Sequence, residues 1–202
     1  MAASGLSGFY GSVFKRSTTA GALIRSGDGC VLLLRAGSGG WDLPGGVVMG
    51  GEDPRSAARR MTRAALGLEL DVGRVLVLDY VQSGGAPGSS AGPGAVRPGS
   101  VRPGGQGDSI AFVFDGGTLA TAVSVFTAGG GEREARFVPV PECAEVLGAA
   151  GGRRIAAALE ALELGTVTEL VDGQAAAGAP AVPPPSRRMM PPVLGFTGIL
   201  GR

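Results

Sequence analysis

One face of a single predicted helix decides which chemistry this chain can perform. The sequence predicts a helix over residues 54–66, because Asp53 suits the N-cap and a proline and a glycine bracket the segment. Residues at spacings of three and four lie side by side on one helix face. Carboxylates at positions 61, 64 and 65 would therefore suit Mg²⁺ together with substrate phosphates. The chain instead has Met61, Ala64 and Ala65, so we expect an apolar face that holds no metal.

The segment around this helix resembles the Nudix box. Nudix hydrolases carry Gly-x5-Glu-x7-Arg-Glu-U-x-Glu-Glu-x-Gly-U, where U is a bulky apolar residue. The chain matches this signature at Gly46, Glu52, Arg60, Gly67 and Leu68. It departs from it at Met61, Ala64 and Ala65, which stand where the family has its three helix glutamates. The resemblance implies that Glu52 and Arg60 pair and brace the loop against the helix, a role that needs no catalysis.

The missing glutamates should abolish ordinary Mg²⁺-dependent diphosphate hydrolysis. Metal catalysis supplies several kcal/mol of charge stabilisation, so its loss costs roughly a thousandfold in rate or more. Hydrolysis could survive only with ligands from elsewhere. The candidate carboxylates are Glu52, Asp53, Asp79, Asp108, Asp115, Glu132 and Glu134. We expect no cofactor.

The chain contains no histidine, which limits the available acid–base groups. Triads of the Ser-His-Asp or Cys-His type and imidazole-based zinc sites are excluded. Proton transfer must therefore come from carboxylates, Tyr10, Tyr80 or a cysteine. A carboxyl group that lines an apolar cavity has its pKa raised by desolvation, which prepares it for proton transfer near neutral pH. We expect Asp79 and Asp115, on strands near the box helix, to be the first catalytic candidates, with Glu52 third.

Composition restricts the class of protein. A chain of 202 residues with 44% hydrophobic content can bury one core. A net charge of +1 gives no reason to expect nucleic acid or an anionic membrane as partner, and no apolar run is long enough for a transmembrane helix. Only two cysteines occur, which indicates a reducing cytoplasm rather than a disulfide framework.

The predicted elements follow the order β-β-loop-α-β-β-β-α, which resembles the Nudix α/β/α sandwich with a mixed β-sheet. Hydrophobic patterning predicts strands at 18–24, 30–35, 75–81, 110–115 and 137–140, a helical turn at 143–148 and an amphipathic helix at 153–164. A single Nudix-like domain at 18–173 is expected, after an N-terminal lead-in at 1–17. Residues 83–107 form a low-complexity insert, either a lid or a chance insertion. Residues 174–202 form a Pro/Ala-rich tail, either frayed or docked through its apolar end.

Two further groups on or near the box bear on ligand binding. Met61, Ala64 and Ala65 would line a neutral pocket, and Trp41 could stack on a ligand ring, although family proteins use that position to anchor the loop. Arg55, Arg59 and Arg63 form a basic stripe that points roughly opposite to this face. We expect this stripe to be a solvated surface and not a replacement for Mg²⁺.

Three functional classes remain open. The first is a repurposed, metal-independent enzyme that performs a cyclisation, isomerisation or other acid–base step on a small metabolite, as in a biosynthetic pathway. The second is a non-catalytic module that senses a ligand or binds a partner. The third is a Mg²⁺-dependent diphosphate hydrolase with reassigned ligands. The neutral pocket favours the first, with a small-molecule substrate or ligand as partner and a homodimer as an open question.

Overall fold

A mixed β-sheet forms the centre of the fold and carries Asp79 and Asp115. The computed structural model describes residues 16–36, 40–82, 108–119 and 133–177. The strands in this part of the chain are β1 (Ser17–Ser26), β2 (Val31–Ala36), β3 (Trp41–Asp42), β4 (Gly45–Val47), β5 (Val75–Val81), β6 (Ser109–Leu119), β7 (Arg133–Val138), β8 (Thr168–Val171) and β9 (Gln174–Ala175). The helices are α2 (Pro54–Leu66), the short 3₁₀ turn η1 (Val140–Glu142) and α3 (Cys143–Leu164).

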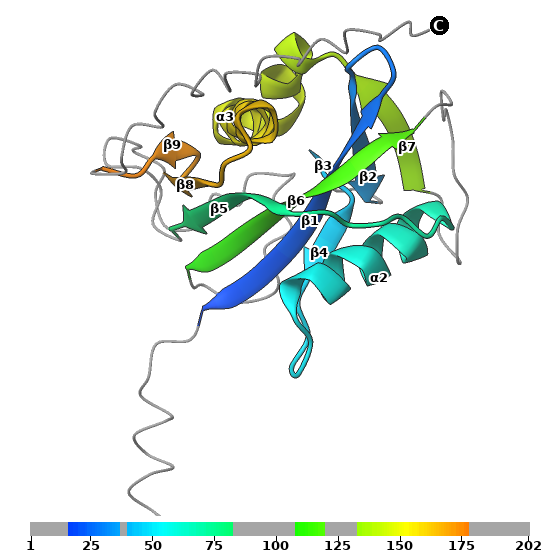
Figure 1. Ribbon diagram of the computed structural model, residues 1–202, viewed down its shortest axis with the longest axis horizontal. Coiled ribbons are helices and arrows are strands. Elements are labelled where there is room, and N and C mark those ends of the chain that lie inside the picture. Colours follow the sequence, from blue (N-terminus) through cyan, green and yellow to red (C-terminus); the bar gives the residue numbers. More distant parts are fainter. Residues whose placement is uncertain (1–15, 37–39, 83–107, 120–132, 178–202) are drawn as a thin grey trace, which may run out of the picture.

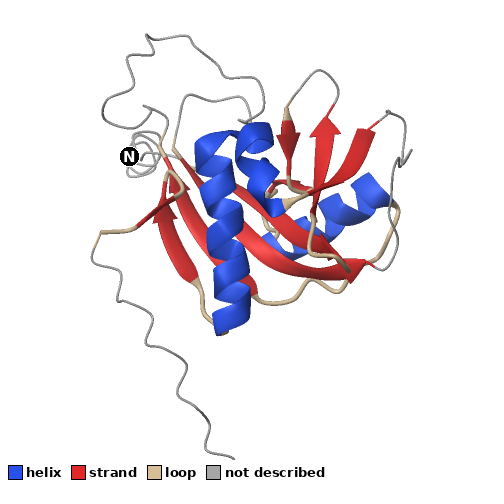
Figure 2. Cartoon of the chain, turned by 90° about the horizontal axis from the view of Figure 1, so that it is seen from above, coloured by secondary structure: helices blue, strands red, loops and turns tan. Residues whose placement is uncertain are grey.

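The strand order is β3-β2-β1-β6-β5-β8-β9, with β4 also paired to β1 and β7 to β2. The pairs β1–β6 and β5–β8 are parallel, and the other pairs are antiparallel. Helices α2 and α3 cover opposite faces of this sheet, α2 over β1 and β4 and α3 over β5 (Figures 1 and 2). The predicted α/β/α sandwich with a mixed sheet is therefore confirmed.

Strand β1 shows why both faces need a helix. Successive side chains of a strand point to opposite faces. Leu23 packs in the cluster beneath α3, while its neighbours Ala22 and Ile24 pack in a cluster beneath α2, and all three are fully buried. Where a strand is buried on both faces, the side chains on both faces are apolar. This explains the continuous apolar run in the middle of β1.

Helix α2 begins and ends where the sequence predicts. The Asp53 side chain accepts hydrogen bonds from the backbone N–H groups of Arg55 and Ser56, both at 3.0 Å. Gly67 ends the helix in the left-handed region, with φ of 67°. The buried face consists of Ala57, Ala58, Thr62, Ala65 and Leu66. Its small side chains bring the helix close to the sheet.

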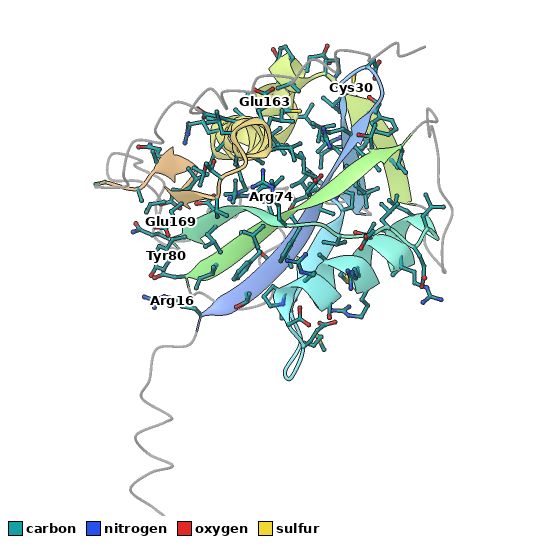
Figure 3. The ribbon with its side chains drawn as sticks, in the orientation of Figure 1. Arg16, Cys30, Arg74, Tyr80, Glu163 and Glu169 are labelled. Carbon is teal, nitrogen blue, oxygen red and sulfur yellow. The ribbon has the colours of Figure 1, made fainter. Side chains whose placement is uncertain are left out.

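Helix α3 joins the two helical segments that the sequence predicts separately. Gly148 marks the break between them, with φ of 78° and ψ of 166° inside the otherwise continuous helix. At the other end, the Arg74 guanidinium donates to the carbonyls of Ala161, Leu162 and Thr166 (Figure 3). A cation at a helix C-terminus satisfies carbonyls that have no partner within the helix. This contact ties α3 to the start of β5.

Some boundaries differ from the prediction. Strand β7 begins at Arg133 rather than at 137, and the short strands β3, β4, β8 and β9 were not predicted. Strand β9 lies just past 173, where the domain was expected to end. Short strands carry too few residues for a clear alternation, so pairing with a neighbour decides them. The insert at 83–107, nearly all of the lead-in and most of the tail lie outside the described residues. Within the described residues, no helix has the length and apolar character to span a membrane.

Candidate functional site

The loop that leads into α2 is held tightly against β1. Gly45 pairs with Gly21, and a Cβ added at Gly45 would lie 2.5 Å from the Ala20 carbonyl oxygen and 2.6 Å from the Gly21 Cα. Only glycine permits this close approach of two backbones. The next residue, Gly46, contacts α2: a Cβ there would lie 2.6 Å from the Met61 Cε. The loop thus contacts α2 at Met61.

The three replaced positions occupy three different environments. Met61 is half-buried over Gly46, and its Sδ accepts a hydrogen bond of 3.0 Å from Arg60 Nη1. Ala64 is exposed, whereas Ala65 is only 1% exposed and packs in the apolar cluster beneath α2. The expectation that Ala65 lines a ligand pocket therefore does not hold, because the sheet covers it.

Glu52 and Arg60 are brought together by the loop and the helix. Arg60 Nε donates to Glu52 Oε1 and Arg60 Nη2 to Oε2, each at 2.7 Å. Arg60 Nη2 also donates to the Val47 carbonyl, and the Met49 N–H donates to Glu52 Oε2. The hydrogen bonds from Arg60 hold the pKa of Glu52 down, at about 2. A carboxylate so strongly held in its ionised form suits bracing better than proton transfer.

Because of the Glu52–Arg60 pair, the stability of the fold should depend on pH in the acid range. Because folding lowers the pKa of Glu52, its stabilising effect is complete above the ordinary value of 4.5 and is lost as pH falls through about 2. We expect Glu52→Gln to lower the melting temperature at pH 7, and the gap to wild type to narrow steadily below pH 4.5. Thermal unfolding followed by circular dichroism at several pH values measures this gap. A gap that stays constant across the range would show that the pair does not stabilise the fold.

Asp79 lies on the far side of the sheet from the box helix. Its side chain is 0% exposed and faces α3, where Oδ2 accepts from Arg154 Nε at 2.7 Å and Oδ1 from the Gly173 N–H at 3.1 Å. The expectation that Asp79 lies near the box helix is therefore wrong. Its neighbour Tyr80 points the other way, and its hydroxyl donates to Asp108 at 2.7 Å. That hydrogen bond raises the pKa of Tyr80, and Arg16 stacks over its ring (Figure 3).

Asp115, the second candidate, has local structural partners. Its Oδ1 accepts from the Gly117 N–H at 3.0 Å and lies 3.5 Å from Arg25 Nη2. The backbone N–H and C=O groups of Asp115 also form hydrogen bonds with the two residues before β5. These contacts describe a carboxylate that shapes the bend of β6.

Trp41 anchors the loop through its packing. The ring packs against the cluster beneath α3, and the Arg136 guanidinium lies over it, 4.4 Å from the ring centroid. A guanidinium on an aromatic face is a favourable cation–π arrangement. This face of the ring is therefore already covered within the chain.

Asp42 is a candidate that the sequence reasoning missed. It lies on β3 between the half-buried Trp41 and Leu43, and it is itself half-buried. Burial raises the pKa of Asp42, against a 2.8 Å hydrogen bond from the Leu43 N–H and the charge of Arg154, which both lower it. The available signal was a carboxylate between two bulky apolar residues, directly before the glycine loop.

Cys143 does not supply a nucleophile. The residue is fully buried at the start of α3, close to the carbonyls of Val138 and Pro139. Burial raises the pKa of its thiol, so the reactive thiolate is disfavoured.

Residues 15–159 match the model of the NUDIX domain, and the chain belongs to the NUDIX family. No curated protein matches the chain.

Solved structures of this family share the fold. A MutT protein from Methanosarcina mazei Go1 superposes with a TM-score of 0.52 at 20% identity, over 74% of this chain and 95% of its own. An ADP-ribose pyrophosphatase from Streptococcus suis 89-1591 gives a TM-score of 0.51 at 15% identity, over 78% and 99%. At such identities the similarity establishes the architecture alone.

The metal that the family implies does not fit the residues present. The three helix positions offer no oxygen ligand. Nowhere in the described parts of the chain do three or more acidic or cysteine side chains gather where they could hold an ion. Hard cations such as Mg²⁺ require oxygen ligands. The box of this chain is therefore not a Mg²⁺ site of the family type.

Proposed function

We propose that this protein is a metal-independent enzyme that performs an acid–base step on a small metabolite, in place of diphosphate hydrolysis. The observation that supports this proposal is the packing of two of the three helix positions where the family has glutamate. Met61 covers Gly46, and Ala65 belongs to the core. A packed apolar face supports neither the charge nor the geometry of phosphoryl transfer.

Asp42 is the acid–base group that we propose. The three carboxylates expected from the sequence are each held by an arginine, Glu52 by Arg60, Asp79 by Arg154 and Asp115 by Arg25. Burial raises the pKa of Asp42. A carboxyl group with a raised pKa can both hold and release a proton under mild conditions.

The hydrolase alternative can be tested without knowing the substrate. With Mg²⁺ or Mn²⁺ and ADP-ribose or another nucleoside diphosphate derivative, we expect the nucleoside monophosphate and the matching sugar or alkyl phosphate to be released at the uncatalysed rate. Calorimetric titration with Mg²⁺ should show no binding in the micromolar range. Release that EDTA abolishes would overturn the proposal in favour of a hydrolase with reassigned ligands.

Asp42→Asn tests the proposed group. Asparagine keeps the oxygen that accepts from the Leu43 N–H but cannot titrate. Because folding raises the pKa of Asp42, the charged group lowers stability at neutral pH, and the cost disappears as pH falls. The variant should therefore melt a few degrees higher at pH 7 and, once a substrate is found, lose at least tenfold in turnover. Full turnover in this variant would exclude Asp42 from the chemistry.

A non-catalytic ligand-binding module is the second candidate. It is favoured by the same arginine pairing of Glu52, Asp79 and Asp115, which gives each of these carboxylates a structural partner. Ligand binding that is unchanged in Asp42→Asn, with no turnover in wild type, would support this function instead.

A further inference from the structure

A basic groove runs along the outer surface of the box helix. It lies between the C-terminal half of α2 and the segment that follows it, and has a volume of about 480 Å³. Its lining residues are Arg59, Arg60, Arg63, Glu69, Leu70 and Asp71. These side chains carry three positive and two negative charges, and the half-buried Leu70 adds an apolar surface.

Arg59 and Arg63 each form an ion pair with an exposed carboxylate. Arg59 Nη2 lies 3.2 Å from Asp71, whose side chain is 98% exposed, and Arg63 Nη1 lies 2.6 Å from Glu69, whose side chain is 76% exposed. Exposed ion pairs of this kind contribute about 0–1 kcal/mol. A ligand can therefore replace either carboxylate at little cost.

Arg60 contributes charge to the groove but keeps its structural contacts. Its guanidinium bonds to Glu52, to the Val47 carbonyl and to Met61, as a brace requires. Arg59 and Arg63 lie one helical turn apart on α2. All three arginines line the groove, so one ligand bound there could contact more than one of them.

The arginine stripe expected from the sequence is divided by the structure. Arg55 turns inward, donates to the Val72 and Gly73 carbonyls and lies over the Phe114 ring. Its role is to hold α2 against the segment before β5. Within the described part of the chain, Arg59 and Arg63 pair with exposed carboxylates, and both line the groove. The predicted stripe therefore consists of one anchoring residue, Arg55, and a separate surface that Arg59 and Arg63 line.

We propose that this groove binds a small polyanion, through its phosphate or carboxylate groups, directly and without a metal ion. Planar guanidinium groups form paired hydrogen bonds with the oxygens of both groups. The box helix would then bind anions by its own charge. This inference does not depend on Asp42 or on the proposed reaction.

Calorimetric titration of the full chain in buffer freed of divalent metal by a chelating resin, at low and physiological salt, tests the groove. The probes are inorganic pyrophosphate and citrate; tighter binding of one identifies the phosphate or carboxylate class, and equal binding supports their shared chemistry. We expect binding that weakens with salt, and a loss of about tenfold in the double variant Arg59→Gln/Arg63→Gln. The matched control is Arg35→Gln, an exposed arginine paired with Glu134 on β7, which should bind as wild type does.

A second pair of variants tests the sign of the effect. Glu69→Gln and Asp71→Asn remove the carboxylates that compete for the arginines, so each should strengthen polyanion binding several-fold. Weaker binding in these two variants would overturn the proposal, because it would show that Glu69 and Asp71 themselves contact the ligand. Absence of binding at millimolar probe, or an equal loss in Arg35→Gln, would also overturn it.

Discussion

Ala65→Glu should lower the free energy of unfolding by about 3–5 kcal/mol, the cost of an uncompensated buried charge, whereas Ala64→Glu should change it by less than about 0.5 kcal/mol. The two positions are adjacent, and the family has a glutamate at both. Here Ala65 is 1% exposed among apolar side chains of β1 and β2, while Ala64 is exposed. Ala64→Glu is therefore a matched control for helix propensity and charge.

The effect should also depend on pH. Desolvation raises the pKa of a glutamate at position 65, so the side chain takes up a proton more readily in the folded state. The destabilisation should thus be smaller at pH 4 than at pH 8. Urea unfolding at both pH values measures it. Equal stability of the two variants at pH 8 would show that the helix can roll away from the sheet and leave Ala65 accessible.

This result bears on whether three glutamates at these helix positions could bind a metal ion in this chain. If residue 65 belongs to the core, introducing glutamate at all three positions would not by itself create a metal site, because Ala65 packs against the sheet. Met61 fills the space over Gly46 in the same way. The substitutions and the packing around them have to be considered together.

The sequence predicted the local features of the box well. The caps that bound α2, the pairing of Glu52 with Arg60 and the layered architecture all follow from short-range signals, namely cap residues, a signature spacing and the order of elements. Each depends on residues close together in the chain or on a well-defined family pattern.

The partners of the acidic residues could not be predicted in this way. Alternation indicates that Asp79 and Tyr80 face opposite sides of β5, but not which side carries the box helix. The partner of Asp79 is Arg154, which lies 75 residues further along the chain. Asp42 was overlooked because it lies in a segment predicted as a loop, and its burial depends on contacts between β3 and α3.

Arg154→Ala should lower the free energy of unfolding by about 3–5 kcal/mol, because it leaves the Asp79 carboxylate buried without its cation. Asp79 is 0% exposed and Arg154 is 21% exposed, so the arginine can reach water when its partner is removed and the aspartate cannot. Asp79→Asn should therefore cost less than Arg154→Ala. The double variant should cost less than the sum of the two, since each single change removes the same pair.

Arg153→Ala is the control for these variants. Arg153 is exposed, and among the described residues it donates to the Asp172 and Gly173 carbonyls, so its loss should have a smaller effect on urea unfolding. Equal costs for Arg153→Ala and Arg154→Ala would show that the buried pair does not hold α3.

The comparison also decides how a loss of activity in Asp79→Asn is interpreted. If turnover per folded molecule is unchanged, Asp79 acts by fixing α3 to the sheet; a tenfold loss in fully folded protein would return it to the catalytic candidates.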